Sequence, residues 1–528
     1  MPSTLRRWAI MPVLGFGVAL IIVDSTIVNV ALPKIVHALN MNIAAAEWVN
    51  SAYSLVFAAL LVAIGAMADR SGRRRTFVIG VVVFAIASLV AGAATSSGMM
   101  IGARMLQGVG GAMILPTSLS LVNANFRGKD RAIAFGIWGS VIAGAAALGP
   151  LLGGWLTTYV SWRAIFLLNL PVSLAIVIAA VVLITESKDP DAPGLRDVAG
   201  VLMVSFGFAA LVFGLIEGQH YGWWHAKATF SVAGHDWPGS SSPVPWAFGA
   251  AAVLLVGFVV HLVRATRRGR PALIDLELFR LRSFRWGGLT ILIVALGEFG
   301  LIFVIPLFLQ NVLGLSPLET GAALLPLALG AFAAGGLAAP LSTKIGGVAT
   351  VRIGMALEAI GIAGFAVVVT TPMSAWNFVL PLMIYGLGVG LATAQLTNVA
   401  LAEVPRNRSG QASGVQSTLR QVGSALGTAV LGTVLSIAIT AHTTSSLEHA
   451  GVATADAQHI ADAVQSSAGT VLPSLRAAPV TQPLSGVLDS SFADAITTVG
   501  IVAAAFVLAG LVTSFLIPRV PVEATEER

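Results

Sequence analysis

Long apolar stretches, separated by short polar segments, follow one another along the whole chain. Each stretch has roughly 18 to 25 residues, and a helix of that length crosses the ~30 Å of hydrocarbon in a bilayer. The pattern therefore predicts an all-α integral membrane protein with about fourteen spanning helices. The predicted spans are Trp8–Ala31, Trp48–Ala66, Thr76–Ala94, Met99–Val122, Ala132–Leu156, Ala164–Ile184, Val198–Ile216, Trp246–Val263, Trp286–Leu309, Thr320–Leu341, Val351–Val369, Trp376–Leu396, Ser413–Ala438 and Phe492–Ile517.

The composition agrees with a chain whose main solvent is lipid. Of the 528 residues, 56% are hydrophobic and 10% are charged, whereas soluble chains carry about 25% charged residues. The chain has no cysteine, so neither a disulfide nor a thiolate metal site is expected. The sequence contains no G-x-x-x-x-G-K-[ST] loop, which counts against an ATP-driven pump. We expect no enzyme activity, cofactor or metal, and a proton gradient as the energy source.

Lysine and arginine gather in alternate polar segments. With the N-terminus in the cytoplasm, 24 of the 30 lie inside, 4 outside and 2 within spans. Positive residues favour cytoplasmic loops, so the count predicts a multi-pass protein of the cell membrane with both termini cytoplasmic. The basic residues lie in short loops beside the spans and face anionic lipid, so orientation in the membrane explains the formal net charge of +6 better than nucleic-acid binding does.

Two polar linkers divide the spans into groups. We expect an N-terminal six-helix half over residues 1–185, two linkers with two inserted helices over 186–285, and a C-terminal six-helix half over 286–518. The second half carries a long outer loop, 440–491, with a short surface helix near Ser446–Val464. Residues 519–528 are expected to form a cytoplasmic tail.

The loop after the second span carries a candidate gate. It contains Gly65, Asp69, Arg70, Gly72 and Arg73. A glycine lets helices approach closely, a second glycine allows a tight turn, and an aspartate can meet a helix N-terminus or an arginine. The loop resembles the G-x-x-x-D-R-x-G-R-[KR] signature of the major facilitator superfamily. The alternative is a basic loop that only fixes orientation.

Further motifs narrow this resemblance. The first span contains Asp24-Ser25-Thr26-Ile27-Val28-Asn29-Val30-Ala31-Leu32-Pro33, and the fifth contains Gly149-Pro150-Leu151-Leu152-Gly153-Gly154. Together with Arg104 and the glycines after it, they resemble the drug:H+ antiporter branch with fourteen transmembrane helices. The resemblance implies two related halves around a central site near the midplane, and export rather than symport. Gly149, Pro150, Gly153 and Gly154 would act as a kinked, pliable joint in the gate.

Charged residues inside spans are costly unless they are paired or wetted, so they indicate function. Asp24 and Arg104 each lie ~21 Å from the inner surface at about 1.5 Å per residue. If the first and fourth spans line the cavity, as the resemblance implies, these two residues can form an ion pair. For Asp24 a role in helix packing alone is the alternative.

Glu298 is the first candidate for proton carrier. It lies roughly 18 Å inside the ninth span, and we expect no cation at comparable depth nearby. A desolvated carboxyl of this kind favours its protonated form, and an entering lipophilic cation would favour the ionised form. A neutral glutamate hydrogen-bonded inside the bundle is the alternative. Arg420 is expected to pair with a carboxylate or a helix end across the gate, and Glu358 to lie at the periphery.

The predicted proton-coupling residues are thus Glu298, Asp24 and Arg104. The predicted substrate cavity contains Asp24, Asn29, Glu298, Tyr385, Gln395 and Asn398. We expect a proton-coupled antiporter that exports small amphipathic, often cationic, compounds and works as a monomer in the lipid bilayer. A dedicated exporter of one metabolite or antibiotic remains open, followed by a proton symporter and a membrane protein without transport activity.

Overall fold

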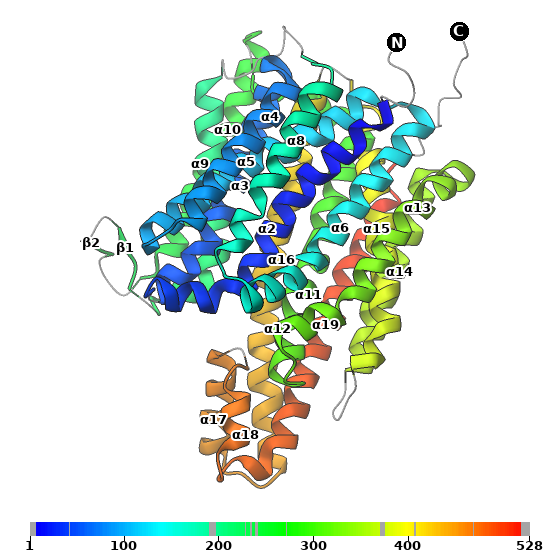
Figure 1. Cartoon of the computed structure of the whole chain (residues 1–528). Coiled ribbons are helices and arrows are strands. Elements are labelled where there is room, and N and C mark those ends of the chain that lie inside the picture. Colours follow the sequence, from blue (N-terminus) through cyan, green and yellow to red (C-terminus); the bar gives the residue numbers. More distant parts are fainter. Residues whose placement is uncertain are drawn as a thin grey trace.

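The computed structural model describes residues 7–41, 43–188, 197–227, 229–232, 235–237, 241–270, 272–369, 375–405, 408–467 and 469–518. Almost all of this part of the chain is helical (Figure 1). The elements are α2 Ile10–Ala38, α3 Ile43–Ser71, α4 Arg73–Gly92, α5 Ser97–Asn125, α6 Gly128–Tyr159, α7 Ala164–Leu167, α8 Asn169–Leu183, α9 Val198–Tyr221, β1 Ser231–Val232, β2 His235–Asp236, α10 Pro243–Arg267, η2 Leu276–Arg280, α11 Arg282–Asn311, α12 Pro317–Ala323, α13 Leu325–Ile345, α14 Gly347–Val368, η3 Ala375–Phe378, α15 Val379–Ala400, α16 Ser409–His449, α17 Thr454–Ser466, α18 Leu472–Ala477, η5 Gln482–Leu484 and α19 Ser485–Ser514.

Thirteen helical stretches within the described residues are long and apolar enough to cross a membrane. They correspond to thirteen of the fourteen predicted spans, and the remaining one, 132–156, falls within the long helix α6. The prediction of an all-α membrane protein is therefore confirmed. The predicted tail, 519–528, lies outside the described residues.

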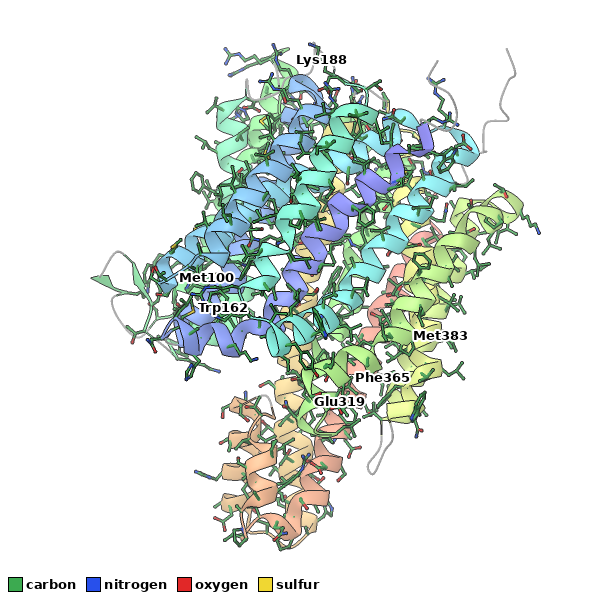
Figure 2. All side chains as sticks on the ribbon, viewed as in Figure 1. Met100, Trp162, Lys188, Glu319, Phe365 and Met383 are labelled. Atoms are coloured by element: carbon green, nitrogen blue, oxygen red, sulfur yellow. The ribbon has the colours of Figure 1, made fainter. Side chains whose placement is uncertain are left out.

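Consecutive long helices run in alternate directions, so the bundle has two ends (Figure 1). We call the end at which α2 begins and α19 ends the basic face, because the turn with Arg73 and the α10–α11 connection with Arg268 lie there. Lys188 lies at this face and Glu319 toward the opposite, far face (Figure 2).

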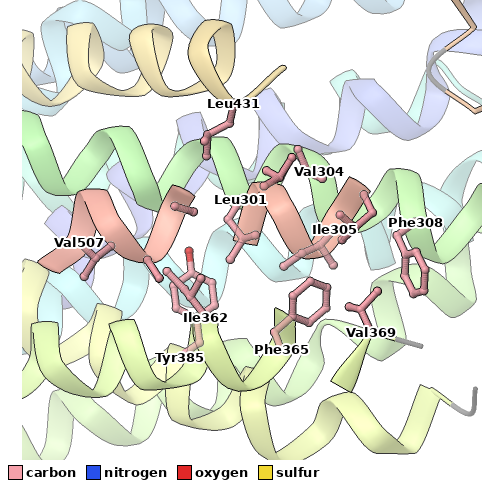
Figure 3. Packing of buried hydrophobic residues seen from close by; sticks show 14 of the residues in the cluster. Leu301, Val304, Ile305, Phe308, Ile362, Phe365, Val369, Tyr385, Leu431 and Val507 are labelled. Atoms are coloured by element: carbon pink, nitrogen blue, oxygen red, sulfur yellow. The ribbon is translucent and has the colours of Figure 1, made fainter. Parts of the chain in front are cut away.

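We refer to α2 to α8 as the N-terminal group, to α11 to α19 as the C-terminal group, and to α9 and α10 as the inserted pair. One large apolar core lies within the C-terminal group, and Val507, Leu301, Phe365 and Phe308 are spread along it (Figure 3). A second core joins α2 to α6 with α8, parts of the inserted pair, η2 and the first turns of α11 and α16. The inserted pair packs together, and α9 also packs against α3 and α16.

Large apolar side chains also cover the outside of the bundle. Val253 of α10 is 74% exposed and Val367 of α14 is 78% exposed. Such side chains would form an aggregation-prone surface in water, but they match the hydrocarbon of a bilayer. The burial pattern thus agrees with the membrane assignment made from composition.

The predicted outer loop, 440–491, is largely helical. Helix α16 continues to His449, eleven residues beyond the predicted end of its span at Ala438, and packs against α17 and α19. These segments extend the bundle at the far face (Figure 1). The surface helix predicted near Ser446–Val464 is wrong in its bounds, because the end of α16 and most of α17 occupy that range with a turn between them.

Candidate functional site

A cavity of about 340 Å³ lies between the N-terminal and C-terminal groups. Its wall is mostly apolar in area, and helices α2, α3, α5 and α6 face α11, α13, α15 and α16 across it. Polar side chains from both helix groups interrupt this apolar wall, and such a mixture suits small organic molecules. The polar and charged residues of the wall are Ser25, Thr26, Tyr53, Ser54, Trp138, Glu298, Thr393, Thr397, Gln416, Ser417, Arg420, Gln421 and Ser424.

An ion pair forms the charged part of this wall. The Arg420 Nη2 of α16 donates to both carboxylate oxygens of Glu298 on α11, at 3.1 and 3.2 Å. The guanidinium also lies 5.3 Å from the Phe299 ring centroid. The prediction that Glu298 lacks a cation neighbour is therefore wrong. Arg420 does pair with a carboxylate, but the partner lies in the C-terminal group and not across a gate.

Asp24 and Arg104 form the predicted ion pair, which is confirmed with 2.5 Å between Asp24 Oδ2 and Arg104 Nη1. Both side chains are buried in the N-terminal group. Arg104 also donates to the Val49 carbonyl and lies 4.5 Å from the Tyr53 ring centroid. Asp24 is not among the residues that line the cavity. Its predicted place in the cavity wall is corrected to the layer behind Tyr53, which lines the cavity itself.

Sequence reasoning missed the polar residues that complete this network. Gln107 and Asn169 each donate an amide N–H to Asp24 Oδ1, at 2.9 and 2.7 Å, and both also donate to Ser88. The network joins α2, α4, α5 and α8. Its signal in the sequence is a glutamine three residues after Arg104, since residues i and i+3 share a helix face.

The candidate gate loop connects the two groups at the basic face. The Asp69 carboxylate accepts hydrogen bonds from the backbone N–H groups of Gly410 and Gln411, at 2.8 and 2.9 Å, at the start of α16. It also pairs with Arg73 at 2.7 Å. Asp69 thus meets a helix N-terminus and an arginine, the two kinds of partner that the motif predicted.

Close backbone contact brings the same helices together. A methyl group added at Gly65 would lie 2.6 Å from the Gly410 carbonyl oxygen, so a larger residue forces α3 and α16 apart. Gly72 adopts φ +113°, a conformation that L side chains rarely adopt, and turns the chain into α4. Glu186 accepts the N–H groups of the first turn of α4. Arg70 is half-buried at the end of α3.

Further hydrogen bonds join the groups near this gate. Asn123 donates to Ser409 at 2.9 Å, and Arg131 donates to the Asn398 side chain at 3.0 Å. Gln395 donates to the backbone carbonyl of Ala132. Asn398 and Gln395 were predicted in the cavity, and the structure places them instead in contacts between α15 and α6.

Tyr385 and Asn29 are the other two residues that were predicted to line the cavity. Tyr385 is buried in the apolar core of the C-terminal group, and its hydroxyl donates to the backbone carbonyl of Glu298 at 3.1 Å. It is not among the residues that line the cavity, so its predicted place is corrected. The side chain of Asn29 lies outside the described residues.

The glycine and proline motif of α6 faces α2. A methyl group at Gly149 would lie 1.8 Å from Thr26 Oγ1, and one at Gly153 would lie 2.8 Å from Ile27. Gly154 faces Leu318 of α12 at an ordinary contact distance of 3.4 Å. Pro150 lies inside the continuous helix α6. The motif therefore allows α6 to pack closely against α2 and to contact α12 of the C-terminal group, and its gating role stays a prediction.

Glu358 of α14 is the residue whose position differs most from the prediction. It was expected at the periphery, but its side chain is completely buried, and α15 packs against its backbone at Gly388. Neither carboxyl oxygen has a hydrogen-bond partner within the described part of the chain. Among the described residues, no three histidine, aspartate or glutamate side chains are placed to hold a metal ion.

Comparison with known proteins gives the family. The family model described as Major Facilitator Superfamily matches residues 14–428. The chain is 34% identical over 461 residues to the "Probable actinorhodin transporter" of Streptomyces coelicolor, which covers 85% of this chain and 75% of the relative. It is 32% identical to the "Multidrug efflux pump LfrA" of Mycolicibacterium smegmatis, with 96% of both chains covered. It is also 32% identical to the "Tetracenomycin C resistance and export protein" of Streptomyces glaucescens, over 81% of this chain and 76% of the relative.

Solved structures share the fold. The crystal structure of the human organic anion transporter MFSD10 matches with a TM-score of 0.60 at 14% identity, covering 98% of this chain and 100% of the other. A bacterial homologue of the human lysosomal transporter Spinster, in an inward-facing state, matches with a TM-score of 0.53 at 18% identity, covering 98% and 100%. At these identities the likeness concerns the fold alone.

Proposed function

Because this chain belongs to the Major Facilitator Superfamily, a family of membrane transporters and not of enzymes, we propose that it exports small amphipathic compounds, many of them cationic, in exchange for protons. Its relatives carry names of drug and antibiotic exporters. We further propose that the N-terminal and C-terminal groups rock against each other as two halves within one monomer.

The observation that carries this proposal is the Glu298–Arg420 pair, the charged part of a cavity wall that is mostly apolar in area. Apolar side chains suit the hydrophobic part of a substrate, and a carboxylate attracts a positive charge in a low-dielectric setting. A proton that binds Glu298 removes this negative charge and releases Arg420. Proton binding and cation binding then oppose each other, which is the requirement for antiport.

The gate supports alternating access. Asp69 holds the first turn of α16 at the basic face, and Gly65 packs against the same turn. We propose that the basic face is cytoplasmic, as the distribution of lysine and arginine predicts. The structure then represents a state whose cytoplasmic gate is closed, and breaking these contacts opens the cavity to the cell interior.

Asp24 and Arg104 lie outside the cavity wall, and we propose that they couple proton binding to the packing of the N-terminal half. Their network ties α2, α4, α5 and α8 together around one buried carboxylate. Protonation of that carboxylate weakens every hydrogen bond that it accepts. The packing of the N-terminal half would then depend on proton occupancy.

A dedicated exporter is the second candidate. Two of the relatives are named for one antibiotic each, actinorhodin and tetracenomycin C, and the third is named a multidrug efflux pump. Growth of cells that express the chain, measured against several unrelated toxic compounds, separates the two functions. Protection against many compounds supports broad export, and protection against one chemical class supports a dedicated exporter.

Transport into inverted membrane vesicles tests the proposal. The vesicles receive a fluorescent lipophilic cation outside and a pH gradient, acidic inside, and uptake is followed for the wild type, Glu298→Gln and Asp24→Asn. We expect wild-type uptake to collapse when the gradient is dissipated, and Glu298→Gln to lose gradient-driven uptake. Glu217→Gln is the matched control, because Glu217 is a buried glutamate of α9 that does not line the cavity.

If the wild type took up the cation equally well with and without the pH gradient, proton coupling would be refuted. Full gradient-driven uptake by Glu298→Gln would remove Glu298 from the mechanism and leave Asp24 as the candidate. Size-exclusion profiles of each variant in detergent establish that a loss of uptake does not reflect a loss of folded protein.

A further inference from the structure

Glu358 is a buried acid without a hydrogen-bond partner. Its side chain has no solvent-exposed surface, and both carboxyl oxygens lack a partner within the described part of the chain. Burying an isolated ionised carboxylate in such surroundings costs much free energy, so this position favours the protonated, neutral form of Glu358. If Glu358 served packing alone, an uncharged side chain could fill the same space without the cost of a buried carboxyl group.

Close helix packing encloses the residue. A methyl group added at Gly388 of α15 would lie 2.3 Å from the backbone nitrogen of Glu358. At Gly361, one turn farther along α14, an added methyl would lie 2.4 Å from the backbone nitrogen of Tyr385. Helices α14 and α15 thus touch through their backbones at the acid and one turn beyond it.

The charged neighbours of Glu358 are those of the cavity wall. Tyr385 of α15 connects the surroundings of Glu358 to the cavity wall, because its backbone packs against α14 at Gly361 and its hydroxyl donates to the Glu298 backbone carbonyl at 3.1 Å. The electrostatic effects of Glu298 and Arg420 extend to Glu358. The other ionisable groups on α14 and the helices packed against it lie toward the helix ends: Lys344 on α13, Arg352 on α14, and Asp489 and Asp494 on α19.

The charged groups around Glu358 do not balance unless one acid is neutral. They are one permanent cation, Arg420, and two acids, Glu298 and Glu358. Arg420 pairs with Glu298, so the cluster is neutral when Glu358 carries a proton. Loss of that proton leaves one uncompensated negative charge beside the cavity, and a substrate cation supplies the missing positive charge.

We propose that Glu358 holds the proton that the C-terminal group exchanges for a cationic substrate. The proposal rests on the proposed function and deepens it, because it moves the exchanged proton from the cavity wall to the layer behind it. The Glu298 carboxylate accepts the proton from the Glu358 carboxyl, and Arg420 turns from Glu298 to the new Glu358 carboxylate. Glu298 then gives the proton to cavity water as the substrate cation takes its place, so one positive charge leaves and one enters.

Proton release on substrate binding tests this step. Purified protein in a weakly buffered solution with a pH indicator is titrated with tetraphenylphosphonium. For the wild type we expect about one proton released per bound cation, and an affinity that rises up to about tenfold per pH unit until the acid is ionised. For Glu358→Gln we expect binding without proton release and an affinity that no longer depends on pH. The matched control, Glu217→Gln, should behave as the wild type.

A conservative variant distinguishes proton carriage from packing. Glu358→Asp keeps a titratable group but shortens the side chain, whereas Glu358→Gln keeps the length and loses the proton. Release retained in the aspartate variant and lost in the glutamine variant supports the proposal, and the reverse pattern overturns it. If the glutamine variant fails to fold or bind, tetraphenylphosphonium binding to Glu358→Asp without proton release overturns the proposal.

The result also separates this proposal from the proposed function. A wild type that binds the cation, releases no proton and transports without regard to the gradient refutes antiport itself. A proton-coupled wild type with unchanged proton release in Glu358→Gln refutes only the role of Glu358. Wild-type uptake that requires sodium at constant pH also refutes that role, because a metal cation would then replace the proton.

Discussion

Replacing Asp69 by asparagine should open the basic face. The carboxylate accepts two backbone hydrogen bonds from the start of α16 and pairs with Arg73. A hydrogen bond to a charged group contributes about 1.5 to 3 kcal/mol, and a neutral one about 0.5 to 1.5 kcal/mol. Asparagine keeps one acceptor oxygen and turns an N–H group toward the second donor. The closed state should therefore lose roughly 3 kcal/mol, equivalent to about a hundredfold shift in the equilibrium.

Cysteine labelling measures this shift. The chain has no cysteine, so Ser54→Cys in the cavity wall provides a single target. A membrane-impermeant maleimide added to inverted vesicles should reach this cysteine much faster when Asp69→Asn is also present. Asp130→Asn is the matched control, because Asp130 pairs with Arg7 at the same face in a partly exposed setting where an ion pair contributes little. Equal labelling rates with and without Asp69→Asn would refute the gate.

Two further predictions concern packing in the N-terminal group. Arg104→Gln leaves the buried Asp24 carboxylate without its cation, which should lower the free energy of unfolding by about 3 to 5 kcal/mol. Adding Asp24→Asn should restore much of the thermal stability measured in detergent. Absence of this rescue would contradict the pairing. Gly149→Ala places a methyl group 1.8 Å from Thr26 Oγ1 and should destabilise the folded protein by about 1 to 3 kcal/mol. The control is Gly144→Ala, whose added methyl group meets nothing within 4 Å. Equal melting temperatures for the two variants would argue against close packing at Gly149.

The sequence predicted the Asp24–Arg104 pair because both residues interrupt long apolar runs, and their depths could be calculated from the helical rise. The same arithmetic missed the Glu298–Arg420 pair. The predicted span began at Ser413, which puts Arg420 only ~11 Å deep, whereas α16 begins at Ser409 and puts it ~17 Å deep. One helical turn in a boundary thus hid the cation partner of Glu298.

Other differences arise from tertiary packing. Glu358 was expected at the periphery because its helix is the third of the C-terminal half, but glycines on α14 and α15 draw the two helices together around it. Gln395 and Asn398 lie near the end of α15, where the two helix groups meet at the basic face. A sequence pattern gives the depth of such residues, but it does not give the neighbouring helix that they contact.

Helix α16 links events at the two ends of the protein. It is a single helix of 41 residues, about 60 Å long at about 1.5 Å per residue. Its first turn is held by Asp69, Arg420 lies about three turns farther along, and its last turns lie in the extension at the far face. If it moves as a rigid rod, a tilt of about 5° around its first turn displaces its other end by about 5 Å. The displacement of a fluorophore attached near His449 would therefore report, from outside the bundle, whether the gate at the opposite end is open or closed.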